Sequence, residues 1–89
     1  MKKVQKITIN KGEGRNPLPP PATRFNWDEA QAVLRSWAYD VSERSYLKCD
    51  VYVTFEDGSD YTCRYDMSWN GRNTNGESLQ QQVEREMGC

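Results

Sequence analysis

The stretch that decides the fold runs from Leu47 to Met67 and reads LKCDVYVTFEDGSDYTCRYDM. Two segments in which apolar and polar residues alternate flank the short polar sequence Glu56–Gly58. Alternation with a period of two is typical of β-strands that bury one face. Gly58 suits a hairpin loop built from a type I turn and a bulge, because the bulge residue needs a positive φ angle. The stretch therefore predicts a β-hairpin.

The length of this loop fixes which residues of the two strands face each other. A loop of three residues pairs Phe55 with Ser59, Val53 with Tyr61, Val51 with Cys63 and Cys49 with Tyr65. The other face then pairs Thr54 with Asp60, Tyr52 with Thr62 and Asp50 with Arg64. A loop of two residues would set the hydrophobic residues opposite aspartate and arginine and split the core. Turn chemistry and hydrophobic pattern thus predict the same register.

A helix is predicted to begin after Asn26, which can cap it, with Glu29 completing a capping box and Phe25 packing onto Ala30. Apolar residues recur at helical spacing at Trp27, Ala30, Val33, Leu34, Trp37, Ala38 and Val41. We interpret this stripe, including its two tryptophans, as the face that packs on the sheet.

The remaining segments complete a small α+β domain. Residues 3–10 alternate like a strand, residues 12–21 form a proline-rich connector, and residues 68–76 form a polar loop. A final helix is predicted over residues 77–87, where Leu79, Val83 and Met87 recur every four residues. The order β-α-β-β-α predicts a small antiparallel sheet with a central hairpin, helices packed on one face and solvent on the other.

We expect a single domain over residues 1–89. The N-terminal strand and proline-rich connector occupy residues 1–24, and a helix–hairpin–helix core occupies residues 25–87. A chain of 89 residues with 36% hydrophobic residues has little apolar surface left for a deep, dry substrate pocket. The sequence also contains no histidine, the usual general base near neutral pH and the commonest metal ligand. We therefore expect no enzymatic activity, no small-molecule substrate, no metal and no cofactor.

The three cysteines match no zinc-site spacing. Cys49 and Cys63 fall on the apolar face of the hairpin and are interpreted as core residues, whereas Cys89 is terminal and expected to be exposed and open to oxidation. An odd number of cysteines, without a signal peptide or a run long enough to span a membrane, favours reduced thiols. We expect a cytoplasmic protein of a bacterial host, away from membranes.

The charge balance argues against a protein that grips a nucleic-acid backbone. The formal net charge is −1, from 12 basic and 13 acidic residues, whereas such proteins usually carry a basic excess. The basic residues near the start of the chain, Lys2, Lys3, Lys6 and Lys11, are interpreted as solvated lysines of an edge strand.

Binding residues are predicted on the solvent face of the hairpin and in the loop that follows it. Tyrosine, tryptophan and arginine are enriched at interface hot spots. The predicted partner-binding residues are Asp50, Tyr52, Arg64, Asp66, Trp69, Asn70 and Arg72. Two alternatives stay open: Asp50 and Arg64 as a plain cross-strand ion pair, and Trp69 folded back over the end of the core. An exposed edge strand would also allow homodimers.

Part of the chain carries a recognisable pattern. A Tyr-x-Lys-x-Asp segment leads into the apolar part of the first hairpin strand, a Phe-x-Asp-Gly turn follows it, and Tyr-x-x-Arg-Tyr-Asp lies in the second strand. The matching residues are Tyr46, Lys48, Asp50, Phe55, Asp57, Gly58, Tyr61, Arg64, Tyr65 and Asp66. With the preceding helix, the segment 25–87 resembles the large polyvalent protein-associated domain, family twenty-five, of phages and plasmids.

The resemblance implies an origin in a mobile genetic element and no particular chemistry. Small stand-alone proteins of phages and plasmids often antagonise host defence. The leading hypothesis is therefore an anti-CRISPR-type inhibitor that docks on a host protein or ribonucleoprotein effector. One alternative is a nucleic-acid-associated accessory protein that uses Lys2, Lys3, Lys6, Arg15 and Arg72; another is a structural module that forms homodimers.

Overall fold

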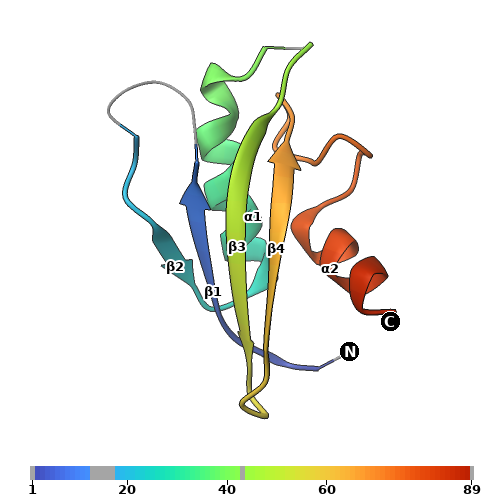
Figure 1. Ribbon diagram of the computed structural model, residues 1–89. Coiled ribbons are helices and arrows are strands. Elements are labelled where there is room, and N and C mark those ends of the chain that lie inside the picture. Colours follow the sequence, from blue (N-terminus) through green and yellow to red (C-terminus); the bar gives the residue numbers. More distant parts are fainter. Residues whose placement is uncertain (1, 13–17, 43, 89) are drawn as a thin grey trace.

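The computed structural model describes residues 2–12, 18–42 and 44–88 of the chain (Figure 1). Its elements are β1 (Val4–Lys11), β2 (Ala22–Arg24), α1 (Trp27–Trp37), the 3-10 helix η1 (Ala38–Asp40), β3 (Leu47–Phe55), β4 (Asp60–Met67) and α2 (Leu79–Met87). The strands form one four-stranded antiparallel sheet in the order β2-β1-β3-β4. The predicted α+β class, with helices packed on the sheet, is confirmed.

The predicted hairpin register is confirmed in every pair. Cys49 lies opposite Tyr65, and the pairing runs down the strands to Thr54 opposite Asp60. At the turn, the backbone N–H of Phe55 donates to the carbonyl oxygen of Ser59 over 2.8 Å. Gly58 has a φ angle of 89°, the left-handed conformation that the bulge position requires.

Strand β2 was not predicted, because the sequence assigned its residues to the proline-rich connector. Ala22, Thr23 and Arg24 pair with Ile9, Thr8 and Ile7 of β1. These residues follow the last proline of the segment, so their backbone N–H groups are available to a neighbouring strand. Three residues are too few to show an alternating pattern.

The core lies between the sheet and the two helices, which pack on the same face. Figure 1 shows α1 running behind β1 and β3, with α2 beside β4. The inward residues of the sheet, of α1 and of α2 form one buried cluster that includes Ile7, Ile9, Leu34, Val51, Val53, Phe55, Tyr65, Leu79 and Val83. Cys49 is buried in this cluster and Cys63 packs against it partly buried, as their positions in the register predict. Cys89 lies outside the described residues.

Asn26 caps α1 as predicted, since its Oδ1 accepts a hydrogen bond of 2.8 Å from the backbone N–H of Glu29. The predicted packing of Phe25 on Ala30 is wrong: the side chain of Phe25 is 66% exposed. Thr23 pairs with Thr8 on the helix-free face of the sheet, and strand alternation sends Phe25 to that same side.

Helix α2 begins two residues later than predicted. Ser78 and Gln81 form a capping box at its N-terminus, and Leu79 and Val83 are buried beneath it. No helix in the described part of the chain has the length and hydrophobicity that crossing a membrane would require.

Candidate functional site

One face of the sheet carries no helix in the described part of the chain, and we call it the open face. Its residues are Lys6, Thr8 and Asn10 of β1, Thr23 of β2, Lys48, Asp50, Tyr52 and Thr54 of β3, and Asp60, Thr62, Arg64 and Asp66 of β4. None of these side chains is buried. The open face is therefore a broad polar surface presented by a rigid sheet.

Tyr52 lies at the centre of the open face. The register places it in one row with Thr8 and Thr23 on one side and Thr62 on the other. Its side chain is 48% exposed. Tyr52 is thus an exposed aromatic ring surrounded by short threonine side chains.

The charged residues predicted for binding lie beside this row. The Nε atom of Arg64 is 2.8 Å from Oδ1 of Asp66, two residues along the same strand. Asp50 lies opposite Arg64 on β3. The structure thus brings Asp50, Tyr52, Arg64 and Asp66 onto one surface, as the sequence predicted.

The loop between β4 and α2 holds the other predicted residues. Trp69 is 53% exposed and does not belong to the buried core cluster, so the alternative that folds it over the core is wrong. Asn70 follows it, and its Oδ1 accepts hydrogen bonds from Ser68 Oγ at 2.9 Å and from the Arg72 N–H at 3.0 Å. The side chain of Arg72 turns away, toward the carbonyl oxygen of Gly76 at 3.1 Å.

Trp69 and Asn70 line a cleft of about 400 Å³ beyond the end of the hairpin. We call it the Tyr46–Trp69 cleft, and its lining residues are Arg44, Ser45, Tyr46, Ser68, Trp69, Asn70, Asn73, Thr74 and Gly76. Sequence reasoning did not include Tyr46, which is 45% exposed, among the binding residues. The sequence signal that could have identified Tyr46 is its position just before β3, in a segment that contains several aromatic residues.

A buried amide pair fixes the loop against the outer edge of β4. Asn73 Nδ2 donates to Gln82 Oε1 over 2.7 Å, and Gln82 Nε2 donates to the carbonyl oxygen of Arg64 over 3.0 Å. Both amides are 4% exposed. Gln82 thus occupies one carbonyl group of the β4 edge, Asn73 forms a bridge with Met67 at its end, and β2 at the other edge has only three residues.

The basic residues proposed for a nucleic-acid-binding role do not form one patch. Lys2 lies beside the hairpin turn, with Nζ 3.2 Å from Oδ2 of Asp57, whereas Arg72 lies in the loop at the opposite end of the sheet. Lys3 and Lys6 lie at the same end as Lys2. Arg15 lies outside the described residues.

Lys11 is not a solvated lysine, in contrast to the sequence interpretation. It is 2% exposed, and its Nζ donates to the carbonyl oxygen of Trp37 over 3.2 Å. The reason is that Lys11 continues the alternation of Ile7 and Ile9 and lies opposite buried Cys49 of β3, so its side chain faces the helices. The ammonium group meets the C-terminal end of α1, where a positive charge is favourable.

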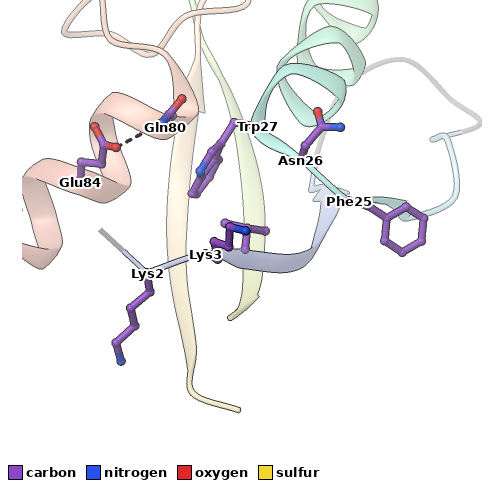
Figure 2. Close-up of a pocket in the computed structure, with 8 residues that line it drawn as sticks. Lys2, Lys3, Phe25, Asn26, Trp27, Gln80 and Glu84 are labelled. Carbon is purple, nitrogen blue, oxygen red and sulfur yellow. Dashed lines mark hydrogen bonds between the residues drawn. The ribbon is translucent and has the colours of Figure 1, made fainter. Parts of the chain in front are cut away.

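A second recess, of about 270 Å³, lies at the other end of the molecule (Figure 2). Trp27 lines it between the two helices, and Gln80 donates to Glu84 over 3.1 Å on its α2 side. Phe25 points away from the other labelled side chains in this view. The recess contains none of the predicted partner-binding residues, although Lys2 and Lys3 of the nucleic-acid alternative line it.

Among the described residues, the pKa shifts give no sign of an activated nucleophile. Burial raises the pKa of the Cys63 thiol to about 12, so the thiol stays protonated near neutral pH. Hydrogen bonds from Arg85, and then from Asn73, lower the pKa of Glu77 to about 2. Within the described ranges, no group of three His, Cys, Asp or Glu residues is placed to hold a metal ion.

Comparison of the chain with protein-family models, with curated proteins and with solved structures gives no match. The resemblance to the phage and plasmid domain therefore stays an expectation from the residues alone.

Proposed function

We propose that this protein works without catalysis, as a binding protein that docks on a host macromolecule through the open face of its sheet. The observation that carries this proposal is the position of Tyr52, 48% exposed at the centre of a face that no described helix covers. A large aromatic ring with a polar tip is a common anchor at protein interfaces.

The charges of the open face favour a protein surface as the partner. Three basic side chains (Lys6, Lys48 and Arg64) are interspersed with three acidic ones (Asp50, Asp60 and Asp66). A nucleic-acid backbone would repel the carboxylates, whereas a partner with charges of both signs can pair with each of them.

Within this class, we propose an inhibitor of the anti-CRISPR type, which occludes a working surface of a host defence effector. The support for this narrower proposal is the resemblance of residues 25–87 to a mobile-element domain. The test is target-DNA cleavage by purified CRISPR effector complexes with and without the protein. Inhibition that weakens in Tyr52→Ala and persists in Tyr39→Ala supports the proposal, because Tyr39 is an exposed tyrosine of η1, on the side of the sheet that the helices cover.

A salt titration separates this proposal from the nucleic-acid alternative. Binding to a generic DNA duplex that falls steeply with salt would indicate contacts to several phosphates. We expect no duplex binding at physiological salt. Duplex binding that is lost when Lys2, Lys3 and Lys6 are replaced by glutamine would favour the accessory-protein alternative.

A further inference from the structure

We infer that the Tyr46–Trp69 cleft binds a nucleoside monophosphate, with the base against the aromatic side chains and the phosphate at Arg44. This inference goes beyond the proposed function and does not depend on it. It concerns a different surface, formed by the segment before β3 and the loop after β4.

Two large aromatic side chains line the cleft and remain open to solvent. Tyr46 is 45% exposed and Trp69 is 53% exposed. Such rings stack on the flat face of any nucleobase. The cleft volume of about 400 Å³ falls in the range of small-ligand sites.

Hydrogen-bond donors in the cleft remain unused within the described part of the chain. The Oδ1 atom of Asn70 accepts two hydrogen bonds, from Ser68 and Arg72, which fixes the amide and leaves its Nδ2 donors available. The hydroxyl of Thr74 has no partner among the described residues either. Asn73 differs, because its Nδ2 donates to Glu77 and Gln82 and its Oδ1 accepts two backbone N–H groups. The available groups suit a ligand rich in acceptors.

The charge of the cleft favours an anion. Arg44 is the one charged residue of its described lining, and none of these lining residues is acidic. The guanidinium of Arg44 makes no hydrogen bond or ion pair with a described residue, and it matches the geometry of a phosphate group. Two other recesses in the described part of the chain each include a carboxylate, Glu84 in one and Asp66 and Glu86 in the other.

The cleft wall is held in place before any ligand arrives. The hydroxyl of Tyr65 lies 3.0 Å from the carbonyl oxygens of both Gly71 and Glu77, and Gln31 Nε2 donates to Gly71 over 2.8 Å. These contacts fix the loop that carries Trp69 to β4 and α1. A preorganised site loses less free energy on binding than a mobile loop would.

The test is a titration of the full chain with adenosine monophosphate, followed by the indole N–H signals in a proton–nitrogen NMR spectrum. The Trp69 signal is assigned by its absence in Trp69→Phe. We expect saturable shifts of this signal, with dissociation constants between about 10 µM and 1 mM. Uridine monophosphate should bind the same site, and inorganic phosphate alone should give no shift at Trp69.

Variants separate the roles of base and phosphate. Tyr46→Ala should weaken binding of adenosine monophosphate at least about tenfold. Arg44→Gln should lower the affinity for adenosine monophosphate to that for adenosine. The affinity for adenosine itself should not change. Phe25→Ala and Arg24→Gln are matched controls outside the cleft and should bind like wild type. The thermal transition of each variant confirms that it is folded.

Three results would overturn the inference. One is the absence of a Trp69 shift at about 10 mM nucleotide. Another is a shift that survives unchanged in both Tyr46→Ala and Arg44→Gln. The third is tighter binding of an acidic tyrosine-containing peptide than of any nucleotide, which would assign the cleft to a protein segment.

Discussion

The hydroxyl of Tyr65, from the middle of the core, lies 3.0 Å from the carbonyl oxygen of Gly71 in the loop after β4. The same hydroxyl lies 3.0 Å from the carbonyl oxygen of Glu77, where that loop ends. Burial raises the pKa of Tyr65, so the hydroxyl keeps its proton to donate. A single side chain of the sheet thereby fixes both halves of the loop that carries Trp69.

Replacing Tyr65 by phenylalanine should loosen this loop without disturbing the hairpin. We expect Tyr65→Phe to lower the free energy of unfolding by about 1–2 kcal/mol, because buried carbonyl oxygens lose their donor. Amide hydrogen exchange should accelerate in residues 68–78 and stay slow in β3. Equal acceleration in both regions would show that the loop is not held locally by this hydroxyl.

Gly71 should tolerate alanine much less well than Gly58. Both residues have positive φ angles, 83° and 89°, so both substitutions introduce backbone strain. A Cβ atom on Gly71 would also lie 2.9 Å from the Cα of Arg35, whereas one on Gly58 would meet no atom within 4 Å. We expect chemical denaturation to show that Gly58→Ala lowers the free energy of unfolding by about 1 kcal/mol and Gly71→Ala lowers it by about 3 kcal/mol. Equal losses would contradict the close packing of the loop on α1.

The side chain of Asn73 should contribute more to stability than that of its neighbour Asn75. Asn73 is 4% exposed and makes four hydrogen bonds, whereas Asn75 is exposed. We expect Asn73→Ala to lower the free energy of unfolding by about 2–3 kcal/mol, since it leaves buried groups unpaired. Asn75→Ala should change it by less than about 0.5 kcal/mol. A similar small effect for both substitutions would contradict the role of Asn73 in holding the loop.

The hairpin could be predicted because its signals are local. The alternation of β3 and β4 and the glycine at position 58 lie within one short stretch, and each gives the same register. The placement of Asp50, Tyr52, Arg64 and Asp66 on one face follows directly from that register.

The other features of the fold depend on contacts between residues that are distant in the sequence, and no local sequence pattern predicts such contacts. Gln31 Nε2 donates to the carbonyl oxygen of Gly71, and Gln31 Oε1 accepts the backbone N–H of Leu79. These bonds join α1 to the loop and to α2 across 40 and 48 residues. The burial of Lys11 likewise depends on a distant contact, with the carbonyl oxygen of Trp37 at the end of α1.

Stability should decrease in acid through Glu77. Arg85 donates to both carboxylate oxygens of Glu77, at 2.8 and 3.0 Å, and this pairing is the main cause that lowers the pKa of Glu77 from 4.5 to about 2. A folded-state pKa below the unfolded value gives stabilisation above about pH 4.5 that is lost as the pH falls toward about 2. The thermal midpoint of wild type should therefore fall between pH 6 and pH 3 more than that of Glu77→Gln.

Asp57 should also stabilise the fold less in acid, and it provides a comparison for the effect assigned to Glu77. Hydrogen bonds from Ser59 lower the pKa of Asp57 to about 2, so Asp57→Asn should also flatten the acid dependence. The thermal midpoint of the double variant should depend less on pH than that of either single variant. If Glu77→Gln loses as much thermal stability between pH 6 and pH 3 as wild type, the Glu77–Arg85 pair does not govern the acid response.

The most direct test of the docking surface is co-purification from bacterial cells with three tagged forms of the protein: wild type, Tyr52→Ala/Arg64→Ala and Tyr39→Ala. The substituted side chains are exposed, so each form should keep the wild-type thermal midpoint within a few degrees. We predict that wild type and Tyr39→Ala retain the same partner protein in near-stoichiometric amount, and that the double variant loses it. Retention of that protein by the double variant at the wild-type level would contradict the assignment of the open face as the docking surface.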